Sequence, residues 1–204
     1  MKTVLLMLTV AGLIVGTPVM AQSVDVEALK KKLTERGGQY AQLKEILEEA
    51  DPEGALAAFD VMVESGNKSL YEIAVSSALS ATDTRLRARA LWEAISRRDH
   101  LIIEVDTEAI KNQDEANKTL NEWHGAQQAW PLHERFLDTQ CINLHRSKRC
   151  YIGRQVTVSG IKLDFTYTGE ISGTFVLQPS GELVGTIVNP RLQSIIYPAR
   201  IVFR

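Results

Sequence analysis

The segment YIGRQVTVSGIKLDFTYTGEISGTFVLQPSGELVGTIVNP, residues 151–190, decides the fold, because its apolar side chains recur at every second position. This period is typical of strands with one buried face. The phase shifts at Gly160, which we interpret as a β-bulge, and the 178–182 segment QPSGE predicts a turn. A last strand, IIYPARIVFR, carries Pro198, which predicts a sheet edge since proline cannot donate a hydrogen bond. Tight connections favour an antiparallel meander.

Upstream of the strands, residues 51–98 follow a helical pattern. Asp51, Asn67 and Asp83 stand 16 residues apart and each opens an apolar helical segment. Asp and Asn are preferred helix N-caps, because their side-chain oxygens accept backbone N–H groups of the first turn. With small residues at the same place in each segment, residues 51–98 resemble a short HEAT-like helical repeat. An ordinary helical bundle is the alternative that the pattern leaves open.

The expected fold class is therefore α+β, with an N-terminal antiparallel helical array, possibly a short α-solenoid, followed by a small antiparallel β-meander with one disulfide. The predicted domain organisation is a signal peptide over residues 1–21, a helical region over 22–138, and a disulfide-clasped β region over 139–204 packed on the helices. Within the helical region, residues 24–50 predict two helices or one helix broken at the Gly37–Gly38 pair.

The first 23 residues, MKTVLLMLTVAGLIVGTPVMAQS, have the order of a secretory signal peptide: one positive charge, an apolar run, and small residues before a cleavage site. We expect cleavage after Ala21 and an exported protein, either periplasmic or secreted. The apolar run is shorter than the roughly 20 residues that span a bilayer. The sequence therefore predicts a mature chain with no transmembrane segment.

Charge is divided unequally along the chain. Residues 22–138 hold 14 basic and 22 acidic residues, a net charge of −8, whereas residues 139–204 hold 8 basic and 3 acidic residues, a net charge of +5. This asymmetry predicts two regions with different surfaces. Export and the overall acidic balance argue against nucleic acid as a partner.

Both cysteines lie in CINLHRSKRC, residues 141–150. In an oxidising compartment two cysteines this close in sequence are expected to form a disulfide, Cys141–Cys150. A zinc site using both cysteines and His145 lacks a fourth ligand nearby, and the spacing is not that of a Cys-x-x-Cys redox pair.

Basic residues fill the loop between the two cysteines. We take His145, Arg146, Lys148 and Arg149 as the candidate binding residues, since a constrained cationic loop loses little entropy when it binds an anion. A loop kept soluble by its charges is the alternative. Arg85, Arg87 and Arg89 form a second basic group on an expected helix.

No pattern typical of catalysis stands out. The sequence lacks a phosphate-binding glycine loop, a G-x-S-x-G elbow and an H-E-x-x-H helix. We therefore predict no catalytic residues, no metal and no cofactor, although residues distant in sequence can still assemble a site. The favoured function is an exported, non-enzymatic binding or adaptor module for a protein or an anionic envelope component. An envelope hydrolase and an inhibitor or immunity-type protein are the alternatives.

Overall fold

The computed structural model describes residues 26–49, 51–189 and 195–203. The expected signal peptide lies outside these residues. The chain divides into two units, residues 1–37 and residues 38–204, and every helix and strand that follows α1 belongs to the second unit. Helix α1 (Val26–Glu49) runs through Gly37 and Gly38 without a break, so the predicted interruption is wrong. Flanking i,i+4 ion pairs such as Lys31–Glu35 offset part of the cost of two glycines.

Three short helices follow α1: α2 (Pro52–Glu64), α3 (Lys68–Leu79) and α4 (Thr84–Ser96). Their N-caps are the predicted ones. The side chains of Asp51, Asn67 and Asp83 each accept two backbone N–H groups of the first turn. Each helix therefore begins where the 16-residue spacing places it, and the prediction of these three helices is confirmed.

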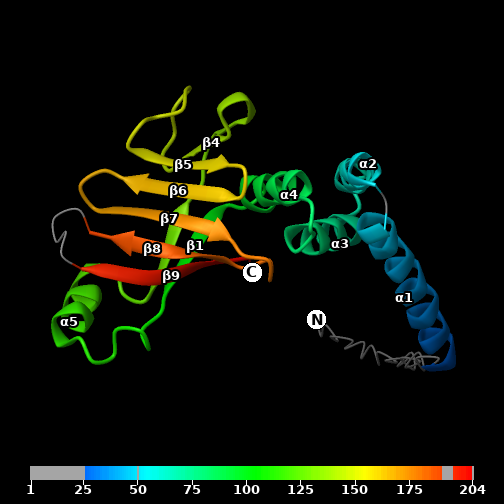
Figure 1. Ribbon diagram of the computed structural model, residues 1–204, viewed down its shortest axis with the longest axis horizontal. Coiled ribbons are helices and arrows are strands. Elements are labelled where there is room, and N and C mark those ends of the chain that lie inside the picture. The colour runs from blue at the N-terminus through cyan, green and yellow to red at the C-terminus, as the bar shows by residue number, and fades with distance from the viewer. Residues whose placement is uncertain (1–25, 50, 190–194, 204) are drawn as a thin grey trace, which may run out of the picture. The chain divides into compact units, whose positions relative to one another are not determined.

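The remainder of the described chain forms a curled, nine-stranded antiparallel sheet with one further helix, α5 (Asp114–Trp123). The strands are β1 (His100–Val105), β2 (Gln127–Pro131), β3 (Arg135–Phe136), β4 (Cys141–Asn143), β5 (Arg154–Ser159), β6 (Lys162–Tyr167), β7 (Ile171–Leu177), β8 (Leu183–Val188) and β9 (Ile196–Val202). Their order across the sheet is β2-β1-β9-β8-β7-β6-β5-β4-β3. In Figure 1, β1 passes behind the layer formed by β5–β9.

One segment joins the two edges of this sheet. β2 pairs with β1, and the chain then continues into β3, which pairs with β4 at the other edge. Between them, the N–H of Leu132 donates to the carbonyl of Asp99 on the β1 side (2.8 Å), whereas the N–H of His133 donates to the carbonyl of Asn143 in β4 (2.8 Å). The segment 127–136 therefore changes neighbours halfway along, and the sheet must curl for both partners to reach it.

The inside of the curl is filled by apolar side chains. Leu101, Phe165, Phe175, Leu183 and Ile187 are fully buried there. The alternation of buried and exposed residues along the strands is the period-two pattern of the sequence.

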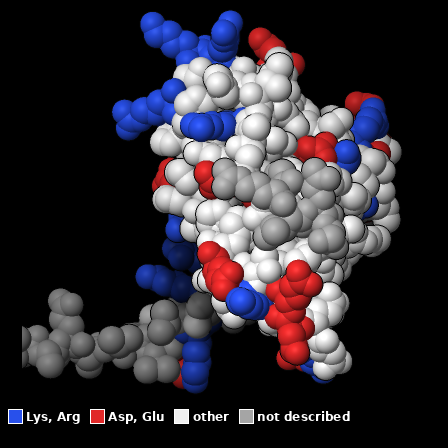
Figure 2. Space-filling view, turned by 90° about the vertical axis from the view of Figure 1, so that its left-hand side faces the viewer, with Lys and Arg blue, Asp and Glu red and all other residues white. Residues whose placement is uncertain are grey.

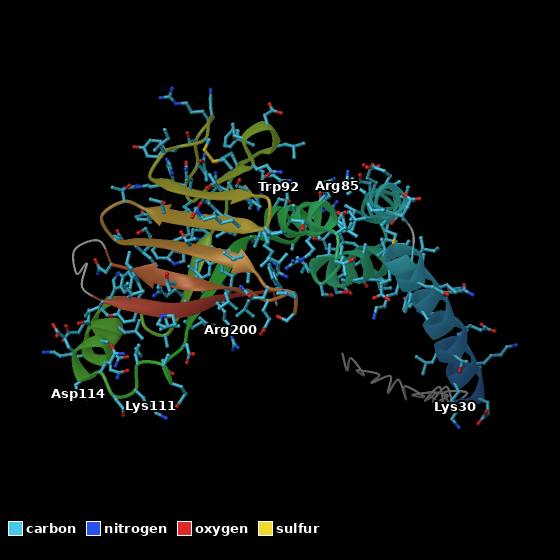
Figure 3. All side chains as sticks on the ribbon, viewed as in Figure 1. Lys30, Arg85, Trp92, Lys111, Asp114 and Arg200 are labelled. Carbon is cyan, nitrogen blue, oxygen red and sulfur yellow. A yellow bond between two sulfur atoms is a disulfide. The ribbon has the colours of Figure 1, made fainter. Side chains whose placement is uncertain are left out.

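The two ends of the curl are covered by helices (Figure 1). At one end Arg87 of α4 donates to the carbonyl of Leu177, the last residue of β7 (2.6 Å). At the other end the hydroxyl of Tyr197 in β9 donates to the carbonyl of Ala116 in α5 (3.3 Å). Trp92 of α4, labelled in Figure 3, is buried where that helix meets the sheet.

Pro198 does not lie at a sheet edge, because β9 pairs with β8 on one side and β1 on the other. The carbonyl of Pro198 accepts the N–H of Asp106 (2.8 Å), just beyond the last β1 pair, Val105–Ala199. In an antiparallel strand the N–H and C=O of one residue point to the same neighbour. The missing N–H therefore faces the chain beyond β1 and costs no bond to β8.

Gly160 is part of a hairpin turn and not of a bulge. β5 and β6 pair from Arg154–Tyr167 to Ser159–Lys162, which leaves Gly160 and Ile161 as the two turn residues. Gly160 has φ +59°, a conformation that glycine adopts without a Cβ penalty. The fold class nevertheless matches the expectation: helices followed by an antiparallel sheet with one disulfide, an α+β protein. The domain boundaries stay a prediction.

Candidate functional site

The β4–β5 loop, residues 144–153, contains all four candidate binding residues. Cys141 in β4 and Cys150 in the loop form the predicted disulfide, with their Cα atoms 6.1 Å apart. Cys141 is fully buried and pairs with Thr157 of β5, so the bridge ties the loop to the sheet. The loop is therefore anchored covalently close to its base.

Asn143 fixes the backbone of the loop from inside. This fully buried residue lies in β4, and its side-chain amide donates to the carbonyls of Ser147 (3.4 Å) and Arg149 (2.9 Å). Its side-chain oxygen accepts the N–H of Tyr151 (2.9 Å). A buried amide with all these bonds made is a rigid internal support, since breaking any of them would leave a buried polar group unpaired.

Glu134 supplies a second support from the neighbouring strand segment. The backbone N–H of Ser147 donates to Glu134 Oε2 (3.0 Å), and this bond is the main cause that lowers the pKa of the Glu134 carboxyl. The positive charges of His133 and Arg146 lower that pKa further. The carboxylate is therefore ionised at neutral pH and holds the middle of the loop.

The cations of the loop point outward. Arg146, Lys148 and Arg149 are exposed, and within the described part of the chain none of the three has an ion-pair partner. Nitrogen-tipped side chains project from this loop at the top of Figure 3. Figure 2 shows Lys and Arg gathered at the same end of the molecule, whereas Asp and Glu gather at the opposite end, over α5.

His145 differs from the other three candidates. Its ring meets the ring of Tyr151 edge-on, with centroids 4.7 Å apart, and the side chain is only partly exposed. Its Nδ1 is buried with no hydrogen-bond partner in the described residues. His145 therefore packs against Tyr151 within the loop, whereas the other three candidates are exposed.

Two members of the second basic group of the sequence, Arg85 and Arg89, form ion pairs with acids. Arg85, which Figure 3 labels on α4, pairs with Glu53 of α2 (2.7 Å). Arg89 pairs with Asp60 (3.0 Å) and with Glu93 (2.7 Å). These arginines join α4 to α2 and leave no cationic patch.

Arg87, the third member of that group, and Arg135 donate hydrogen bonds to backbone carbonyls. Arg87 is 8% exposed and donates to Leu79 (3.2 Å) and Leu177 (2.6 Å), which joins α3, α4 and β7. Arg135 in β3 donates to the carbonyl of Ser96 (2.8 Å), in the last turn of α4. Both positions are structural, because helix ends leave carbonyls without intrahelical partners.

No metal centre is found among residues 26–49, 51–189 and 195–203, since no three His, Cys, Asp or Glu side chains there converge as ligands. His124 Nε2 lies 3.5 Å from Glu170 Oε2, with both side chains partly exposed. His100 borders an open hollow beside Arg97 and Arg98. The histidines therefore lie apart and not in one site.

A hollow of about 440 Å³ lies on the outer face of β1, β8 and β9. Its charged lining consists of Glu104, Asp106, Glu182 and Arg200, and Arg200 pairs with Glu104 at 2.9 Å (Figure 3 labels Arg200). This bond raises the pKa of the Arg200 guanidinium. The lining includes no histidine, cysteine or serine, and its side-chain hydroxyl belongs to Thr107, next to Asp106.

Sequence reasoning missed two parts of the site. Asn143 gives no signal in the sequence, since a single asparagine inside a loop is expected to be exposed. Tyr151 and Ile152 directly after Cys150 do give one: two large apolar residues precede a glycine between a loop and a strand, where turn residues are normally polar. Both are exposed in the structure.

Comparisons with protein-family models, with curated proteins and with solved structures find no match for this chain. The resemblance of residues 51–98 to HEAT-like repeats therefore gains no support from a family model. No helix within the part of the chain that the structure describes is long and apolar enough to cross a membrane.

Proposed function

We propose that this chain is an exported, non-enzymatic binding module that uses the β4–β5 loop to bind an anionic partner, on a protein or an envelope component. The observation that carries the proposal is the combination of three exposed, unpaired cations with a loop backbone fixed from inside. Rigid presentation matters because a loop already held in one conformation loses little entropy on binding.

Charge complementarity supports the same proposal. Within the described residues no acidic side chain forms an ion pair with Arg146, Lys148 or Arg149, whereas arginines such as Arg85 and Arg89 are paired with acids. Solvent-exposed cations concentrated at one end raise the local concentration of anions and speed their association. The disulfide fits export, because such bonds persist in oxidising compartments.

The test is retention of the oxidised protein on immobilised polyglutamate at low and moderate salt. We expect the triple variant Arg146→Ser, Lys148→Ser, Arg149→Ser to elute at clearly lower salt than the parent protein. The control is Lys30→Ser, Lys31→Ser, Lys32→Ser, which removes the same charge from the exposed side of α1. Equal elution of parent and loop variant would contradict the proposal, as would an equal loss in the control.

A further inference from the structure

The turn that follows the basic loop has an apolar tip. The N–H of Arg154 donates to the carbonyl of Tyr151 (3.1 Å), which closes a four-residue turn with Ile152 and Gly153 at its centre. Gly153 has φ +96°, and a Cβ there would lie 2.4 Å from Thr168 Oγ1. The Gly153 carbonyl accepts the backbone N–H (2.7 Å) and the hydroxyl (3.0 Å) of Thr168, which ties the turn to the β6–β7 connection and leaves Ile152 exposed.

Ile152 is 88% exposed and Tyr151 is 47% exposed. Such exposure is unfavourable in water for an isoleucine side chain on a rigid turn. The two hydrogen bonds from Thr168 to the Gly153 carbonyl hold the turn in the conformation that exposes Ile152. Single exposed apolar side chains are common on protein surfaces, and what distinguishes Ile152 is its place directly beside the exposed cations Arg149 and Arg154.

The apolar tip and the cations belong to one support. Asn143 donates to the carbonyls of Ser147 and Arg149 and accepts the N–H of Tyr151, so a single buried side chain positions both segments. Arg154, at the end of the turn, adds a fourth exposed cation, stacked over the ring of Tyr167 at 4.8 Å.

We infer that residues 146–154 dock on the surface of a bilayer that contains anionic phospholipid. This inference rests on the proposed function and names its partner class. A soluble polyanion would satisfy the cations alone and leave Ile152 in water, whereas a bilayer supplies phosphate groups above an apolar layer. Tyrosine is also typical of the membrane–water interface.

The charge distribution orients the molecule for this contact. The cationic loop lies at one end of Figure 2, and the acidic surface over α5 lies at the other. An anionic bilayer therefore attracts the first end and repels the second. Each Lys or Arg near such a surface strengthens binding about fivefold, and insertion of one isoleucine side chain adds roughly tenfold.

The experiment compares co-sedimentation with two vesicle types, phosphatidylcholine alone and phosphatidylcholine with 30% phosphatidylglycerol. Polyglutamate retention is measured in parallel. We expect binding to the anionic vesicles only, weakened about tenfold by Ile152→Ser and about a hundredfold by the triple loop variant. Ile152→Ser should leave retention on polyglutamate unchanged. The matched control is Val61→Ser, which removes a 70% exposed apolar side chain from α2 and should change nothing.

The outcomes separate the two proposals. Unchanged vesicle binding in Ile152→Ser, or retention on polyglutamate without any vesicle binding, would overturn the bilayer inference while the anion-binding function stands. Unchanged behaviour of the triple loop variant in both assays would overturn both. Far-ultraviolet circular dichroism and urea unfolding show that each variant is folded, which is expected since every altered side chain is exposed.

Discussion

Two groups of basic residues in this molecule look alike in the sequence and differ in the structure. The arginines around α4 are bound to partners: Arg87 to two carbonyls, and Arg89 and Arg97 to the carboxylate of Glu93. The cations of the β4–β5 loop, Arg146 among them, are exposed and form no ion pair within the described chain. The arginines around α4 join neighbouring elements of the fold, whereas the loop cations are exposed to solvent.

The difference shows that the role of a basic cluster depends on the hydrogen-bond and ion-pair partners of its side chains, and not on the number of its charges. Around α4 the guanidinium groups satisfy backbone carbonyls and acids on neighbouring elements, since carbonyls at helix ends have no intrahelical partners. In the loop the backbone carbonyls are already satisfied by the buried amide of Asn143. The side chains of the loop cations form no ion pair with described residues, although the charge of Arg146 lowers the pKa of Glu134.

The largest expected effect concerns Arg87. Arg87→Ala removes two buried, charge-assisted hydrogen bonds and leaves the carbonyls of Leu79 and Leu177 unpaired. We expect a loss of about 3 kcal/mol in the free energy of unfolding, measured by urea denaturation. The matched control is Arg85→Ala, on the same helix as Arg87. It removes an exposed ion pair with Glu53 of α2 and should leave the midpoint of urea unfolding unchanged. If Arg87→Ala and Arg85→Ala lowered the free energy of unfolding equally, the structural role given to Arg87 would be contradicted.

The second effect concerns the disulfide that sets the loop apart. Replacing Cys141 and Cys150 with serine opens a covalent loop of about ten residues, which should lower the free energy of unfolding by roughly 2–3 kcal/mol. Polyglutamate retention should fall less than in the triple loop variant, because Asn143 and Glu134 still support the backbone. Retention as weak as that of the triple variant would mean that the bridge alone orders the cations.

Much of the fold follows from local patterns. Asp51, Asn67 and Asp83 begin helices because capping is a local interaction, and the period-two segments form strands for the same reason. The position of Pro198 could not be predicted, since it depends on β1 ending beside it. The mostly apolar residues 101–105 fit either a buried helix or a short strand, and the structure makes them part of strand β1. The edge-joining segment 127–136 could not be predicted, because it is specified by partners far away in sequence.

The candidate site was predictable only in part. The two cysteines and the cations between them indicate a clasped basic loop without further information. Arg87 is buried and bonded to a distant carbonyl, whereas Arg146 is exposed. This difference depends on the tertiary structure and could not be predicted from the spacing of the arginines in the sequence. The role of Asn143 depends on burial in the same way.

A smaller effect is expected from pH. The pKa of Glu134 is lowered in the folded protein from an ordinary value of 4.5, chiefly by the Ser147 N–H. Its stabilisation of the loop is therefore complete above the unfolded pKa and is lost as the pH falls through the lower folded pKa. An NMR titration of the Ser147 amide proton should give a midpoint below 4.5. Glu134→Gln should abolish that titration, and a midpoint above the ordinary value would contradict the assignment.

The smallest expected effect is the sharpest test of the comparison. The triple variant Arg146→Ser, Lys148→Ser, Arg149→Ser should unfold at the same urea concentration as the parent protein, because its side chains are exposed and form no ion pairs with described residues. Mutual repulsion of the three cations is removed at the same time, which opposes any loss. A lower urea midpoint would show that these cations stabilise the fold as Arg87 does. The two basic groups would then not differ in their structural role.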